Sequence, residues 1–111
     1  MNLKDSIQAN PNEFLRLCEN HDAKSLYAFG SSANDEFNET TSDIDLLLEL
    51  NTEDPIQRGE NLMSIWDELE NFFQRKVDLL TNSSIKNPIN RKSIESSKIL
   101  IYDEKDHKIS F

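Results

Sequence analysis

Hydrophobic positions in the second half of the chain recur at helical spacing and predict one long helix, from Ile56 to about Gln74. Its apolar residues follow one another at intervals that place them on a single broad stripe. They are Leu62, Ile65, Trp66, Leu69, Phe72 and Phe73. Shorter helices are expected over 12–20, directly after Pro11, and from Pro88 onward, where Asn87 suits the capping position and proline fits the first turn.

Four short apolar runs, at 24–29, 43–50, 77–80 and 99–102, predict strands. The second run alternates, so one of its two faces is aliphatic throughout and is expected to be buried. That face consists of Ile44, Leu46, Leu48 and Leu50. A short helical turn is expected from Ser31, followed by a polar loop over 34–41, and no element is assigned to the polar tail after 102.

The alternation of helices and strands indicates an α/β (α+β) fold, and 111 residues give room for a single domain over 1–111. The net charge of −9 argues against nonspecific binding to nucleic acid, because the phosphates would be repelled. It favours a basic protein partner, or a cation that neutralises clustered acids. The only cysteine, Cys18, has no partner for an internal disulfide. With no signal peptide and no apolar run of membrane-spanning length, a cytoplasmic location is expected.

Two aspartates at the start of the second strand are the strongest candidates for a functional site. Side chains two residues apart on a strand point to the same face, so Asp43 and Asp45 are expected roughly 6–7 Å apart along the chain on one face. Two carboxylates directed at one point repel each other unless a cation lies between them. The pattern therefore indicates a divalent-metal site of the kind used in phosphoryl transfer.

Gly30 and Ser31 follow the first strand, where a chain turning into a helix offers free N–H groups to an anion. The absence of a side chain at Gly30 would let the backbone approach a phosphate closely, and the Ser31 hydroxyl would add a further donor. Asp78 is the candidate for a third carboxylate, because it is the only acid in a short apolar run. A strand there would lie beside that of Asp45, where Asp78 would bind a second metal ion and help to activate an attacking hydroxyl.

Each of these residues also has a simpler interpretation. Asp43 and Asp45 would serve equally as solvated acids that discourage aggregation at a sheet edge. Gly30 would be an ordinary turn glycine, Ser31 a helix cap, and Asp78 a surface acid. The combination, with the glycine and serine at the end of one strand and the paired acids at the start of the next, favours the phosphoryl-transfer interpretation.

The pattern Gly-Ser-x-Ala, Ser-Asp-Ile-Asp-Leu and a later Val-Asp-Leu resembles the nucleotidyltransferase (DNA polymerase beta) superfamily. It is most similar to the minimal nucleotidyltransferase (MNT) antitoxins of HEPN/MNT toxin–antitoxin pairs, a type VII-like system. The resemblance implies a small mixed β-sheet packed by helices on one side. It also implies an Mg²⁺-dependent enzyme that transfers AMP from ATP to tyrosine hydroxyls of a HEPN ribonuclease toxin.

Under this resemblance, Gly30 and Ser31 would hold the triphosphate, and Asp43 and Asp45 would bind one or two Mg²⁺ ions. Asp78 would be the third ligand and the base.

The chain departs from the family pattern just after the glycine and serine. Asn34 and Asp35 stand where the family commonly has a basic residue and a glycine, and the loop to the first aspartate is about one residue longer. The departure motivates a second hypothesis, a catalytically weakened antitoxin that neutralises the toxin by direct binding. Four cations are candidates to replace the missing one: Lys24, Arg58, Arg75 and Lys76. A small-molecule nucleotidyltransferase ranks last, because such enzymes usually need further domains for the acceptor.

Overall fold

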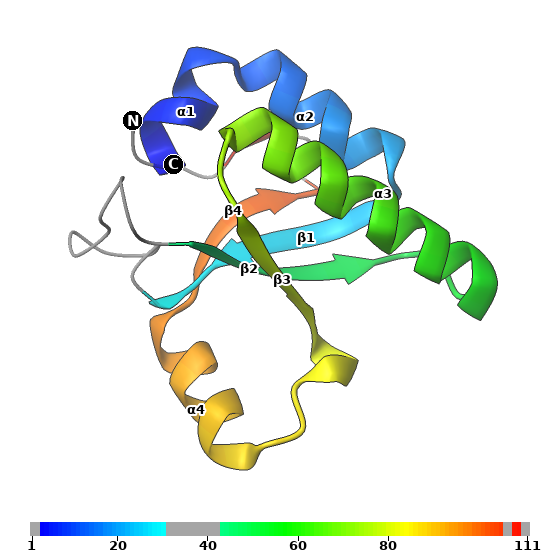
Figure 1. The fold of residues 1–111 in the computed structure, drawn as a ribbon, viewed down its shortest axis with the longest axis vertical. Helices are drawn as coiled ribbons and strands as arrows, with labels where there is room; N and C mark the ends of the chain where they lie inside the picture. Colours follow the sequence, from blue (N-terminus) through cyan, green and yellow to red (C-terminus); the bar gives the residue numbers. More distant parts are fainter. Residues whose placement is uncertain (1–2, 31–42, 106–107, 110–111) are drawn as a thin grey trace.

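The computed structural model describes residues 3–30, 43–105 and 108–109. Five strands in these ranges form one sheet in the order β3-β2-β1-β4-β5 (Figure 1). The strands are β1 (Ala23–Ala28), β2 (Ile44–Leu50), β3 (Val77–Thr81), β4 (Ile99–Asp103) and β5 (Lys108–Ile109). β2 and β3 run parallel, whereas the other neighbouring pairs are antiparallel. The mixed sheet confirms the predicted fold class.

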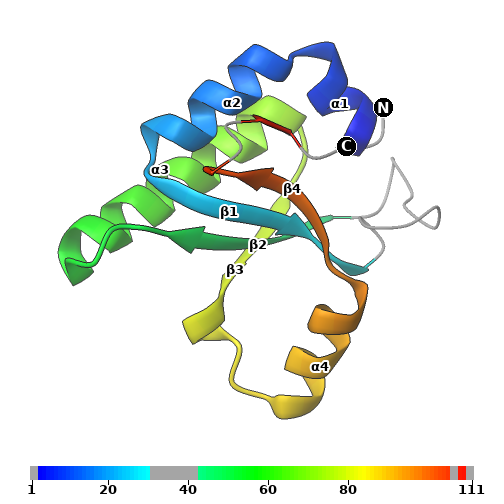
Figure 2. The same cartoon turned by 180° about the vertical axis from the view of Figure 1, so that it is seen from behind.

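Three helices cover one face of the sheet: α1 (Leu3–Ala9), α2 (Pro11–Asn20) and α3 (Pro55–Phe73). Figures 1 and 2 show them together on one side, with α3 crossing over the strands. This is the helical layer that the resemblance implied. The helix predicted from Pro88 onward is confirmed as α4 (Pro88–Ser97), with Asn87 as its N-cap. It follows the short 3₁₀ helix η2 (Asn82–Ser84) and lies on the other side of the sheet. No helix in the described ranges combines the length and apolarity that crossing a bilayer requires.

The main core lies between the sheet and the three-helix layer. The aliphatic face of β2 is buried as expected, with Ile44, Leu46 and Leu48 no more than 1% exposed. The stripe of α3 meets it through Ile65 and Leu69, which are both fully buried. Burying one such side chain contributes about 1.5–3 kcal/mol. This core therefore fixes which face of β2 is left for the alternating residues.

A second, smaller hydrophobic cluster holds α4 against the opposite face. Ile94 of α4 and Ile85, which follows η2, pack on Leu47 of β2. Leu47 is 1% exposed although it belongs to the face on which β2 carries its acids. Half-buried Tyr27, Phe29 and Leu80 complete the cluster. α4 thereby covers part of the face from which Asp45 projects.

Several boundaries differ from the sequence-based predictions. Helix α1 was not expected, because its two buried residues, Leu3 and Ile7, are too few to reveal a period. β5 forms within the tail to which the sequence analysis assigns no element. β2 begins at Ile44 rather than at residue 43, so strand alternation does not fix the direction of Asp43. The expected helical turn from Ser31 and the polar loop over 34–41 lie outside the described residues.

Candidate functional site

The acids of β2 and β3 are brought side by side by the parallel pairing of these strands. The register aligns Asp45 with Asp78, and their strands lie about 4.8 Å apart, as neighbouring strands do. Each acid is flanked along its strand by buried residues that point into the main core, Ile44 and Leu46 for Asp45 and Val77 and Leu79 for Asp78. The two carboxylates therefore share the opposite face. The expectation that the strand of Asp78 lies beside that of Asp45 is confirmed.

Helix α3 fixes the start of β3. Gln74, the residue that caps its C-terminal end, adopts a left-handed conformation with φ +54°, which ends the helix. Both backbone polar groups of Val77 are then hydrogen-bonded to side chains of α3. Its N–H donates to Oε2 of Glu70 at 2.9 Å, and its carbonyl accepts from the indole N–H of Trp66 at 2.8 Å. Asp78 is the next residue, so the long helix determines where the third acid lies.

The acids interact electrostatically. The pKa of Asp45, which is half-buried, is raised above its usual value, first by burial and then by the negative charges of Asp78 and Asp43. A cation at this position would remove the repulsion that contributes to the shift. Asp43 itself is exposed and lies just before β2, where the N–H of Ile44 donates to the carbonyl of Lys76 at 3.1 Å. Asp43 thus adds charge to the site from its edge.

The donor set suits Mg²⁺ better than a cation that needs a complete protein cage. Among the described residues, no group of three or more His, Cys, Asp or Glu side chains is gathered as a metal site would be. Mg²⁺ is commonly bound by one or two carboxylates, with waters and substrate phosphates supplying the other ligands. Asp45 and Asp78 provide such a pair on neighbouring strands, and Asp43 adds negative charge beside it.

Gly30 is required by its conformation and by the closeness of Asp45. Its φ is +61°, a value that residues with a side chain rarely adopt. A Cβ atom placed on it would lie 3.0 Å from Oδ2 of Asp45. The preceding residue, Phe29, donates its N–H to the carbonyl of Asp45 at 3.1 Å. The glycine predicted to admit a phosphate therefore borders the predicted metal ligand directly, whereas Ser31 lies outside the described residues.

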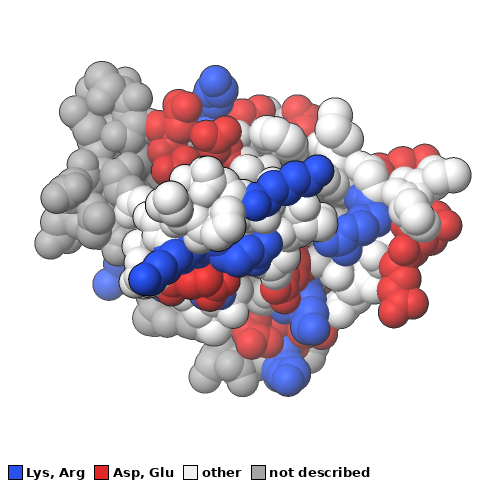
Figure 3. All heavy atoms as spheres, turned by 90° about the horizontal axis from the view of Figure 1, so that it is seen from below, with Lys and Arg blue, Asp and Glu red and all other residues white. Residues whose placement is uncertain are grey.

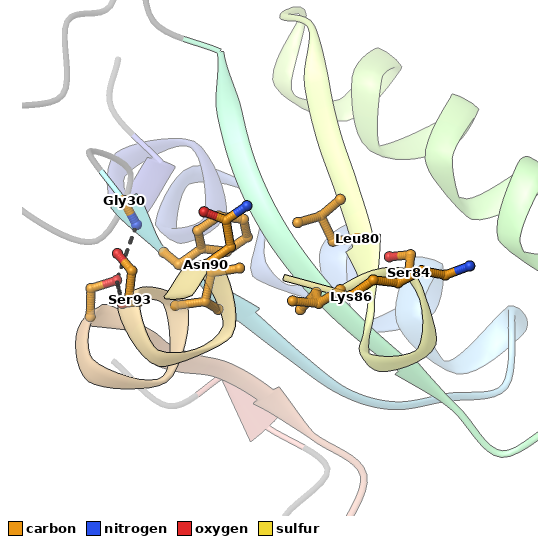
Figure 4. Close-up of a pocket in the computed structure, with 10 residues that line it drawn as sticks. Gly30, Leu80, Ser84, Lys86, Asn90 and Ser93 are labelled. Atoms are coloured by element: carbon orange, nitrogen blue, oxygen red, sulfur yellow. Dashed lines mark hydrogen bonds between the residues drawn. The ribbon is translucent and has the colours of Figure 1, made fainter. Parts of the chain in front are cut away.

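A pocket of about 440 Å³ opens next to Gly30, between α4 and the sheet (Figure 4). Gly30 closes one end, where its N–H donates to Oγ of Ser97 on α4 at 3.5 Å. The other lining residues are Phe29, Leu80, Ser84, Ile85, Lys86, Asn90, Ser93 and Ile94. Sequence reasoning did not find this pocket. The available signal was the polar stripe of α4, where Asn90, Ser93 and Ser97 recur at helical spacing.

The predicted replacement cations lie at different ends of the sheet. Arg58 donates to the carbonyls of Leu50 and Thr52, and Lys24 on β1 lies beside the same end of β2, so both are far from the acids. Lys76 lies at the end of the sheet that carries the acids, because its carbonyl accepts from the N–H of Ile44 at the start of β2. Its side chain is exposed. Arg75 lies one residue farther from β3, half-buried in the turn after α3.

Positive charge also gathers on a part of the surface where sequence analysis did not predict it. Residues 86–98 carry four cations and one acid, in a chain whose net charge is −9. Figure 3, which views the molecule from the side of α4, shows Lys and Arg side chains crossing this face between patches of acids. Arg91 bonds the carbonyls of Asn82 and Ile85, and Lys98 pairs with Glu95, but Lys86 is an exposed lining residue of the pocket.

The sequence and the fold of this chain are both similar to those of known proteins. The sequence profile of the nucleotidyltransferase domain family matches residues 14–101, which include Gly30 and all three acids. The chain belongs to this family. It is a nucleotidyltransferase, and the enzyme class inferred from its motifs is thereby confirmed.

Curated relatives of this nucleotidyltransferase are proteins of Methanocaldococcus jannaschii. "Putative protein adenylyltransferase MJ0126" is 41% identical over 85 residues, which cover 77% of this chain and 83% of the relative. "Putative protein adenylyltransferase MJ1217" matches with the same identity and coverage.

Solved structures share the fold. A protein described as a "putative minimal nucleotidyltransferase" superimposes with a TM-score of 0.63 at 24% identity, covering 89% of this chain and 95% of the other. A toxin–antitoxin structure with AMP-PNP gives a TM-score of 0.60 at 22% identity, covering 88% and 77%. The predicted resemblance to minimal nucleotidyltransferases is confirmed at the level of fold and family.

Proposed function

We propose that this nucleotidyltransferase is an antitoxin that transfers AMP from Mg-ATP to a tyrosine hydroxyl of a HEPN ribonuclease toxin. The alignment of Asp45 with Asp78 on parallel strands beside Gly30 is the observation that carries the proposal. The relatives named as protein adenylyltransferases support a protein as acceptor. A structural neighbour that pairs a tri-AMPylated Shewanella oneidensis HEPN toxin with an MNT antitoxin supports the choice of partner. The reaction would take place in the cytoplasm, where ATP and Mg²⁺ are available.

In the proposed reaction the tyrosine oxygen forms a bond to the α-phosphorus of ATP, and the bond from that phosphorus to the bridging oxygen breaks, releasing pyrophosphate. Bound Mg²⁺ would neutralise the phosphate charge that builds up in this step. Asp45 and Asp43 would hold the cation, and Asp78 would hold it and receive the tyrosine proton. Gly30 would keep side-chain atoms away from the phosphates, and Ser31 would donate to them. Such a step depends mainly on positioning and on charge neutralisation.

The test is the intact mass of the HEPN toxin that is proposed as the partner, after incubation with this chain, ATP and Mg²⁺. Wild-type antitoxin is expected to add one or more AMP units and to abolish ribonuclease activity. The double variant Asp43→Asn, Asp45→Asn should bind the toxin without adding mass. Equal modification by the double variant would exclude the acid site as the source of catalysis.

A second function, neutralisation by contact alone, is favoured by one surface of α3. Ile56 and Met63 are 76% and 67% exposed, and they border a shallow apolar hollow with Glu60 and Asp67 at its rim. An apolar patch with acidic edges suits a basic protein partner. Full protection by the double variant, with no covalent change on the toxin, would establish this function instead.

A further inference from the structure

The pocket beneath α4 lies one step along the strands from the acids. Leu47 and Leu80 form the next aligned pair on the same faces of β2 and β3 as Asp45 and Asp78. Because residues two apart on a strand are separated by about 6.6 Å, this apolar pair begins where the acid pair ends. Leu80 lines the pocket, and Gly30 lines it while also bordering Asp45. A ligand whose phosphates met the acids would therefore extend into this pocket.

The walls of the pocket differ in chemistry. One wall of the pocket is apolar. It is formed by Phe29, which follows β1, Leu80 of β3, Ile85, which follows η2, and Ile94 of α4. The exposed face of α4 offers Asn90 and Ser93, which Figure 4 shows on the helix, away from Leu80 on β3. Apolar surface on one side and few polar groups on the other suit a flat heteroaromatic ring. The pocket volume of about 440 Å³ lies within the range of small-molecule sites.

We infer that this pocket binds the nucleobase of the donor nucleotide and that Asn90 selects adenine over guanine. The inference rests on the proposed function, because it places the phosphates at Asp45 and Asp78. The Asn90 amide has both a donor and an acceptor, which match N7 and the N6 amino group on one edge of adenine. Guanine presents two acceptors on that edge, so the amide oxygen would face O6 without a hydrogen.

The charge around the pocket agrees with an anionic ligand. Lys86 lines the pocket, and Lys92 is exposed on α4, whereas the chain as a whole is acidic. A local positive field attracts a nucleotide towards this face and lowers the repulsion between its phosphates and the acids. α4 would in this way contribute base selection through Asn90 and attraction through Lys92, and Lys86, which precedes the helix, would add to that attraction.

The test measures equilibrium binding of Mg-ATP, Mg-GTP and Mg-tripolyphosphate by calorimetry, so no transfer to a protein is needed. Asn90→Leu removes the amide, and Asn71→Leu makes the same change at an exposed position of α3, across the sheet. Wild-type protein is expected to bind ATP roughly tenfold more tightly than GTP, as one bidentate amide–base pair provides. Asn90→Leu should lose this preference and bind tripolyphosphate unchanged, while Asn71→Leu should behave as wild type.

Three results would overturn the inference. They are an unchanged ATP-to-GTP ratio in Asn90→Leu, the absence of a preference in the wild type, or an equal loss of preference in Asn71→Leu. If the ratio held while the KM for the toxin rose in Asn90→Leu, the pocket would bind the acceptor side chain instead. Failure of the proposed function looks different: the base preference would collapse in Asn90→Leu as expected, yet the wild type would transfer no AMP to the toxin.

Discussion

Alanine substitutions at the two glycines of this chain are expected to change its stability in opposite directions. Gly30 has a φ of +61° and lies against Asp45, whereas Gly59 lies within α3, where a methyl group added to it would meet no atom within 4 Å. Comparing the two variants therefore separates two contributions to stability: the cost of the left-handed backbone and the contact with Asp45 at Gly30, and the general gain from replacing glycine by alanine at Gly59.

For Gly30→Ala, the left-handed conformation costs about 1–2 kcal/mol once a Cβ atom is present. The new methyl group would lie 3.0 Å from Oδ2 of Asp45, which is the end of a side chain and moves by rotation. The contact therefore adds little to the loss of stability, but it turns the carboxylate away from its position beside Asp78. We expect a destabilisation of about 1–2 kcal/mol and a larger relative loss of nucleotidyl transfer.

For Gly59→Ala, the methyl group projects into open space from a helix interior. Alanine is favoured over glycine there by about 0.5–1 kcal/mol, so the variant should be more stable and equally active. Urea unfolding followed by the fluorescence of Trp66 measures both changes. In thermal unfolding, about 1 kcal/mol corresponds to roughly 4–8 °C for a domain near this size. A Gly30→Ala variant as stable as the wild type would refute the reasoning, as would a destabilised Gly59→Ala.

Three further predictions follow from the described contacts. The folded-state pKa of Asp45 is raised above its usual 3.8. Between the unfolded and the folded pKa the folded chain binds more protons than the unfolded chain, so the free energy of unfolding falls as the pH rises through this range. Without Mg²⁺, Asp45→Asn should therefore raise the unfolding temperature at neutral pH, and the gain should vanish below both pKa values. Trp66→Phe leaves the carbonyl of Val77 without its indole donor and should cost about 1–3 kcal/mol in urea unfolding followed by far-UV circular dichroism, because the variant has no tryptophan. Trp66→Tyr also removes the indole N–H, so its loss of stability should be no smaller if that hydrogen bond is the cause. Burial raises the pKa of the Cys18 thiol to about 12, so a thiol reagent should label it only after unfolding, and equal labelling of the folded chain would contradict its buried position.

The parts of the site that follow from local physics were predictable from sequence. The alternation of β2 determined which of its residues face the core, and the stripe of α3 determined the buried side of that helix, as Leu46 and Leu69 show. Gly30 stands out in the sequence as the glycine at a strand end, and its positive φ agrees with that interpretation. The placement of Asp78 beside the strand of Asp45 was expected, but its alignment with Asp45 depends on how α3 returns the chain.

The nucleobase pocket was not predictable for a different reason. It depends on α4 folding back over the sheet, and the only buried residue of α4 is Ile94, which meets Leu47 from a distant part of the chain. No local period indicates such a contact. The same holds for Lys86, whose position at the pocket follows from that packing rather than from its neighbours in sequence.

The most direct test of the proposed function follows which phosphate of ATP reaches the toxin. ATP labelled at the α-phosphate or at the γ-phosphate is incubated with Mg²⁺, the toxin and either the wild-type chain or Asp78→Asn. The account predicts that only the α-label becomes attached to the toxin, that pyrophosphate is released in equal amount, and that Asp78→Asn attaches far less. Attachment of the γ-label, or undiminished α-labelling by Asp78→Asn, would contradict it.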